Sequence, residues 1–91
     1  MNFTATAEQQ WAFILAAVDA ARSDEDLSHI AAGPLEHLLG NHGETYIGAV
    51  EEMARESRAF ARALTGVWQH TMSDAIWARV QKLKESVPNP L

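Results

Sequence analysis

The sequence predicts an all-α protein, a compact bundle of five to six short helices joined by tight turns. Three observations support this fold class. Apolar residues recur three and four positions apart along most of the chain, which is the period of a helix with one buried face. Glycine, proline or a hydroxyl residue separates each apolar stretch from the next. The few β-branched residues are dispersed singly among helix formers, so the chain has no strand pattern.

The first helix is predicted at about residues 6–22. Thr6 and Gln9 have the spacing of a capping box, in which each side chain accepts a hydrogen bond from the backbone N–H of the other residue. The remainder is rich in alanine, which favours a helix and lets a neighbouring segment approach closely. The predicted buried face of this helix consists of Trp11, Ile14, Leu15 and Val18.

Two further helices are predicted between Ser23 and Gly43. Ser23 is a suitable N-cap, and the three acidic residues after it match the positive end of the helix dipole. Gly33 is expected to end this helix, and Pro34 to begin a short third one, where a missing N–H does no harm. Gly40 or Gly43 is expected to end the third helix.

The second half of the chain predicts three more helices. The first begins at Glu44, and the other two are capped by Ser57 and Ser73. Large aromatic side chains bury much apolar area, so we expect the tryptophans to anchor the core. They are Trp11, Trp68 and Trp77.

A chain of 91 residues has enough apolar surface for one core only. We therefore expect a single domain at residues 1–87 and a flexible, proline-containing tail at residues 88–91. The chain has no cysteine, so it forms neither a disulfide nor a thiolate metal site. Its first ten residues lack the features of a secretory signal, and no apolar run approaches the roughly 20 residues that span a bilayer. The expected location is the cytoplasm, without membrane association.

The net charge of −5 is unevenly distributed. Residues 1–56 carry −8, whereas residues 57–91 carry +3. An acidic chain is poorly suited to nonspecific nucleic-acid binding, so we do not expect nucleic acid as a partner. The predicted acidic patch comprises Asp24, Glu25, Asp26, Glu51, Glu52 and Glu56.

The positive charges of the second half allow two interpretations. They form a basic face for carboxylates or phosphates of a partner, or they form salt bridges to the acidic half of the same chain. The residues concerned are Arg58, Arg62, Arg79 and Lys82.

The segment from Ala31 to Ile47 holds the candidates for chemistry, Glu36, His37 and His42. A metal-assisted hydrolase would need these side chains together. Positions 37 and 42 differ by about 140° around a helix, so the two histidines do not share a face. His29 and His70 could join them only through tertiary folding. The chain also lacks a nucleophile motif and a phosphate-binding loop, so we expect no enzyme, no cofactor and no metal.

Two segments resemble a bacterial domain family of unknown function, DUF6869. They are "AAGPLEHLLGNHG" and "FARALTGVWQHTMSDAIWARVQ", and the resemblance extends from about residue 30 to residue 82. It implies a compact helical domain, usually a short bacterial protein that stands alone, and no assigned activity. It marks Glu36, His42 and Arg62 as the positions to test for function. The residues that it places in the core are Leu35, Leu39, Leu64, Trp68 and Trp77.

We predict a small, acidic, non-enzymatic domain that binds another protein, in the manner of a stoichiometric inhibitor of immunity or anti-defence type. An acidic surface can cover a basic partner and accelerate its association. The first alternative is a homo-oligomeric structural or regulatory protein, a homodimer packed through the helix at 6–22. The second alternative is the metal-assisted hydrolase.

Overall fold

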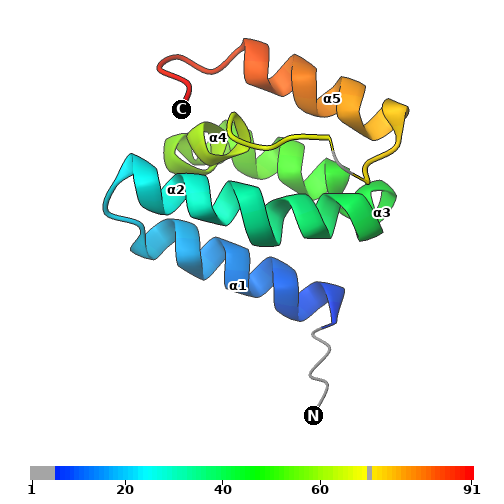
Figure 1. The fold of residues 1–91 in the computed structure, drawn as a ribbon, viewed down its shortest axis with the longest axis horizontal. Helices are drawn as coiled ribbons and strands as arrows, with labels where there is room; N and C mark the ends of the chain where they lie inside the picture. The colour runs from blue at the N-terminus through cyan, green and yellow to red at the C-terminus, as the bar shows by residue number, and fades with distance from the viewer. Residues whose placement is uncertain (1–5, 70) are drawn as a thin grey trace.

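A computed structural model of the protein describes residues 6–69 and 71–91. These residues form four helical segments, the second of them kinked, and no strand, which confirms the all-α class (Figure 1). The first segment is α1 (Ala7–Ala20). The second joins α2 (Asp24–Ile30), the π-helical turn η1 (Ala31–Leu35) and α3 (Glu36–Glu56). The last two are α4 (Arg58–Leu64) and α5 (Asp74–Glu85).

The predicted number of five to six helices is too high, because neither Gly33 and Pro34 nor the kink at His42 divides the second segment into separate helices. The backbone N–H of Glu36 donates to the carbonyl of Ala31, five residues earlier, so this turn holds one residue more than an α turn. Proline lacks an N–H, and its ring crowds the carbonyl four residues before it. The wider turn accommodates Pro34 without ending the helix.

Within α3 the chain reverses its direction at His42, whose φ of −135° and ψ of 29° are not helical (Figure 1). The change of direction therefore falls between Gly40 and Gly43, where a boundary was predicted. The start of α5 packs closely on this kink. A Cβ atom added at Gly43 would lie 3.1 Å from Cγ1 of Ile76, so the absence of a side chain permits the approach.

All the predicted N-caps are present in the structure. Thr6 and Gln9 form the expected capping box, with a distance of 3.1 Å from the Gln9 nitrogen to the Thr6 hydroxyl. Ser23 caps α2, Ser57 caps α4 and Ser73 caps α5, each accepting a hydrogen bond from a backbone N–H three residues later. These local signals place the starts of four helical segments correctly.

The helices are arranged with α1 at one edge of the molecule and α5 at the opposite edge (Figure 1). The short helix α4 packs against all the other helical elements. In contrast, α1 packs against α2, η1, α3 and α4, and does not reach α5 within the described part of the chain. No helix in residues 6–69 or 71–91 combines the length and the apolar character needed to cross a membrane.

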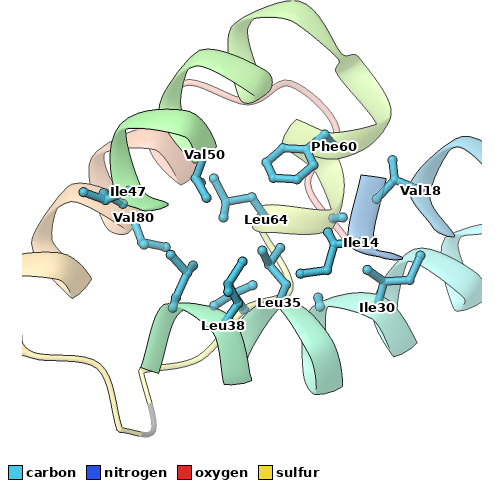
Figure 2. Close-up of a cluster of buried hydrophobic side chains, with 14 of the residues drawn as sticks. Ile14, Val18, Ile30, Leu35, Leu38, Ile47, Val50, Phe60, Leu64 and Val80 are labelled. Carbon is cyan, nitrogen blue, oxygen red and sulfur yellow. The ribbon is translucent and has the colours of Figure 1, made fainter. Parts of the chain in front are cut away.

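The core lies where these helices converge (Figure 2). Phe60 is 1% exposed and packs edge-on against Trp11 of α1, with ring centroids 5.7 Å apart. Trp11 also contacts Tyr46 of α3, so one aromatic cluster connects α1, α3 and α4. The largest fully buried side chains are Phe60, Ile14, Leu35, Leu38, Leu39, Leu64, Val50, Val67 and Val80.

The expectation that Trp68 belongs to the core is wrong. Its side chain is 68% exposed. The reason is that α4 ends at Leu64 and the chain turns at Thr65 and Gly66, so the helical period that placed Trp68 inward stops before this residue. Trp11 and Trp77 are half-buried at the edge of the core.

The C-terminal residues return to α4. The carbonyl of Asn89 accepts a hydrogen bond from Nε of Arg62 at 2.8 Å, and the N–H of Leu91 donates to the hydroxyl of Thr65 at 2.8 Å. The flexibility of residues 88–91 stays a prediction, but the structure gives this segment two specific anchor points.

Candidate functional site

The backbone of the exposed Trp68 is hydrogen-bonded to a buried carboxylate. Glu36, at the start of α3, is 6% exposed although it is acidic. Its Oε2 accepts a hydrogen bond from the backbone N–H of Trp68 at 2.9 Å. Buried carboxylates require such partners, because removal from water without them is costly. Glu36 therefore ties the segment after α4 to the first turn of α3.

Lys84 of α5 also contacts the segment that carries Trp68. Its Nζ donates to the carbonyl of Val67 at 3.1 Å. The ammonium also lies 5.5 Å from the ring centroid of Trp68 and 5.0 Å from that of Trp77, within the range of cation–π attraction. Desolvation lowers the pKa of Lys84, and the negative charge of Glu36 acts in the opposite direction. We call Glu36, Trp68, Trp77 and Lys84 the Trp68 site.

The Trp68 site is suited to binding. It presents one flat apolar surface beside a positive charge, and the backbone under that surface is fixed by hydrogen bonds from α3 and α5. An ammonium has three donors, and the structure assigns one of them to Val67. A partner could therefore stack an apolar side chain on Trp68 and place an acceptor on Lys84.

Two of the predicted basic residues pair with two of the predicted acidic ones. Both terminal nitrogens of Arg62 bind the carboxylate of Asp24, at 2.6 Å and 3.0 Å, across the contact between α4 and α2. Arg79 of α5 also binds Glu51 of α3 through two nitrogens, here Nε and Nη2, with 3.0 Å from Nε to Oε2. The structure thus uses these four side chains to join helices.

The remaining members of the predicted patches are exposed. Asp26 accepts a hydrogen bond from the backbone N–H of Arg22 at 3.0 Å. The predicted acidic residues lie at the start of α2 and in the last turns of α3, two helices that do not contact each other in the described part of the chain. The exposed members are Glu25, Asp26, Glu52, Glu56, Arg58 and Lys82.

The three candidates for a hydrolase are not gathered around a common point. Glu36 is buried against Trp68, whereas His37 and His42 are exposed. His29 is exposed in the last turn of α2, and His70 lies outside the described residues. Among residues 6–69 and 71–91, no group of three or more histidine, aspartate or glutamate side chains is placed to hold a metal ion.

The ion pair between Asp24 and Arg62 gives stability a dependence on pH. Hydrogen bonds from Arg62 hold the pKa of the Asp24 carboxyl below its ordinary value of 3.8. A carboxyl with a lowered folded-state pKa contributes stability above its ordinary pKa and loses it as the pH falls toward the folded value. We expect Asp24→Asn to reduce the loss of stability between about pH 7 and about pH 3.

The measurement is the urea midpoint of both proteins at the two pH values. Glu25→Gln is the control, because Glu25 is exposed next to Asp24 and forms no ion pair with the residues that the structure describes. An equally large acid-induced loss in Asp24→Asn and the parent chain would contradict the role of this pair.

The fold and the Trp68 site define a small all-helical domain with an exposed tryptophan whose backbone segment is held by hydrogen bonds to α3 and α5. The chain belongs to DUF6869, a family of unknown function whose model matches residues 1–87. The match is wider than the predicted range of residues 30–82 and includes α1. No curated protein and no solved structure matches the chain.

The resemblance identified Glu36 as a position of interest, but sequence reasoning missed the surroundings that give it a role. The helical period predicts Trp68 in the core, and no sequence pattern singles out Lys84. A usable signal was the Thr65-Gly66 pair, which precedes Trp68 and ends the helical period. No sequence signal places Lys84 over the two indoles, because that contact depends on how α5 packs.

Proposed function

We propose that this protein is a non-enzymatic, protein-binding domain and that Trp68 lies at the centre of its contact surface. The observation that carries the proposal is a tryptophan side chain 68% exposed on a backbone held by a buried carboxylate. Tryptophan is among the residues most enriched in interaction hot spots. A preorganised side chain also loses little conformational entropy on binding.

The partner's chemistry follows from charge. The chain carries −5 overall, and only Asp24 and Glu51 of the predicted acidic patch are in the ion pairs described above. The exposed acids would steer association with a basic protein surface. As the specific form of the function we propose a stoichiometric inhibitor of immunity or anti-defence type, because a small acidic surface can cover a basic partner.

The test is capture of partners from host lysate with the tagged full chain, followed by native mass spectrometry. The parent chain is compared with Trp68→Ala and with Phe13→Ala, a matched control at an exposed aromatic residue on α1. We expect one heterologous protein at stoichiometric amount, retained by Phe13→Ala. Trp68→Ala should bind it about 30-fold more weakly, which corresponds to a hot spot of about 2 kcal/mol.

The outcomes separate the two parts of the proposal. Recovery of no heterologous protein, or equal binding by Trp68→Ala, overturns the role of Trp68. The charge argument is tested with the triple variant Glu25→Gln, Glu52→Gln and Glu56→Gln, which leaves both ion pairs intact. We expect slower association at low salt, and an unchanged association rate would refute electrostatic steering.

A second candidate function is that of a homo-oligomeric structural or regulatory protein. The observation in its favour is that the outer face of α1 exposes Phe13 and three alanines beside the polar residues Glu8, Gln9 and Asp19. A surface helix ordinarily carries polar residues on its outer face.

A further inference from the structure

We infer that the Trp68 site binds a carboxylate side chain of the protein partner, with an apolar side chain of the partner close to it. The inference rests on the proposed function and specifies what the partner places on this site. The ammonium of Lys84 lies 5.5 Å from the ring centroid of Trp68 and 5.0 Å from that of Trp77. A positive charge and two apolar rings therefore occur at one place on the surface.

The accessible side chains of this site can only donate hydrogen bonds. An ammonium has three N–H donors and an indole has one, and neither group has an acceptor. Lys84 donates to the carbonyl of Val67, which leaves two of its N–H groups without an acceptor in the described part of the chain. The indole N–H groups of Trp68 and Trp77 likewise have no acceptor among residues 6–69 and 71–91. The complement of such a site is a group rich in acceptors.

Charge selects a carboxylate among the groups that accept hydrogen bonds. Glu36 is the acid whose negative charge acts on Lys84, but it is 6% exposed and already accepts the backbone N–H of Trp68. A carboxylate has two acceptor oxygens and the charge opposite to that of Lys84, so it matches both the donors and the ammonium. A basic side chain brings further donors and a like charge, and a neutral amide brings no charge.

The surroundings of Lys84 favour such a pair. Desolvation lowers the pKa of Lys84, so its ammonium is less well hydrated than that of a fully exposed lysine. Two fully hydrated charges gain little from pairing at a surface, because both must give up water. Lys84 has already lost part of its hydration on folding, so an incoming carboxylate removes less water from it.

The apolar part of the partner is required by Trp68. Its side chain is 68% exposed and offers a flat apolar ring beside the ammonium. An apolar side chain near the carboxylate covers this ring and excludes water from the charge pair. The same site fits a basic partner, because residues 57–91 carry +3 whereas the acids that steer association lie within residues 1–56, which carry −8. The partner then has an acidic residue at the centre of a basic surface.

The test is a titration of the isotope-labelled full chain with three peptides, followed through the indole N–H signals in nuclear magnetic resonance spectra. The peptides are acetyl-Phe-Glu-Phe-amide, acetyl-Phe-Gln-Phe-amide and acetyl-Phe-Lys-Phe-amide, so only the central side chain differs. Trp68→Ala identifies the signal of Trp68, and Trp11, outside the site, is the internal reference. We expect the glutamate peptide to shift the signals of Trp68 and Trp77, and the glutamine peptide to bind at least about 5-fold more weakly.

Lys84→Met tests the role of the ammonium, because methionine keeps an unbranched apolar side chain and removes the charge. Lys82→Met is the matched control, since Lys82 is the other lysine of the chain and is exposed on the same helix. We expect Lys84→Met to bind the glutamate and glutamine peptides equally, and Lys82→Met to keep the preference for glutamate. Circular dichroism verifies the fold of both variants, and the peptide comparison in the parent chain is decisive without them.

Equal binding of the glutamate and glutamine peptides by the parent chain overturns the inference, and so does tighter binding of the lysine peptide. Absence of any shift at Trp68 and Trp77 overturns it as well. None of these results bears on the proposed function, which is decided by whether Trp68→Ala loses the captured partner. Equal binding of that partner by Trp68→Ala refutes the proposed role of Trp68, whichever peptide the site prefers.

Discussion

Replacement of Phe60 by alanine is expected to lower the free energy of unfolding by about 3–5 kcal/mol. Phe60 is 1% exposed, and its ring contacts Trp11 of α1 in an edge-on arrangement with an interplanar angle of 78°. Truncation removes this contact and leaves a cavity between helices that cannot collapse fully. Domains of this size have a total stability of about 5–14 kcal/mol, so the loss is a large fraction of the whole.

The measurement is urea unfolding at neutral pH, followed by circular dichroism. Phe13→Ala is the matched control, because it removes the same atoms from a side chain that is 60% exposed. We expect this control to change stability by no more than about 0.5 kcal/mol. A loss below about 1.5 kcal/mol in Phe60→Ala would show that Phe60 does not hold α1 and α4 together as described.

The parts of this fold that depend on neighbouring residues in the sequence were predictable. The capping box of Thr6 and Gln9 and the three serine caps were found where the sequence places them. A cap needs only a side-chain oxygen and a backbone N–H two or three residues later, so its formation depends little on tertiary structure. The buried face of α1 around Ile14 and Val18 follows from the helical period in the same way.

Features that depend on packing were not predictable from the sequence. Gly33 and Pro34 carry strong signals for a helix boundary, yet the chain stays helical through a widened turn. Burial of Ala31 and Leu35, each 0% exposed, provides tertiary stabilisation on both sides of that turn. The number of separate helices was therefore overestimated, although the class was correct.

In the candidate site, too, some features follow from the local sequence and others depend on packing. Glu36 is a candidate both on its residue type and through the resemblance to a family, but nothing local indicates that a first-turn glutamate is buried. Its environment comes from Trp68 and Lys84, which are 32 and 48 positions away along the chain. Likewise, Arg62 and Arg79 were candidates for a partner surface, and only the packing of helices showed that each binds an acid of the same chain.

Replacement of Glu36 by alanine is expected to lower the free energy of unfolding by about 2–4 kcal/mol. A hydrogen bond to a charged acceptor contributes about 1.5–3 kcal/mol, and truncation of a side chain that is 6% exposed adds a cavity. The backbone N–H of Trp68 loses its acceptor in this variant. Glu36→Gln keeps an acceptor oxygen of similar reach, so its loss should be clearly smaller, and urea unfolding compares the two.

The comparison of these variants with Trp68→Ala also separates two roles: Glu36 holds the segment that carries Trp68, and Trp68 contacts the partner. If Glu36 holds the base of the Trp68 site, Glu36→Ala should weaken both stability and partner binding, because the segment that carries the indole is no longer tied to α3. Trp68→Ala should weaken binding while changing stability by less than Glu36→Ala, since most of its side chain is in water. Glu36→Gln keeps an oxygen that can accept the Trp68 N–H, whereas Glu36→Ala does not. Equal losses of stability in the two variants would therefore contradict the acceptor role of Glu36.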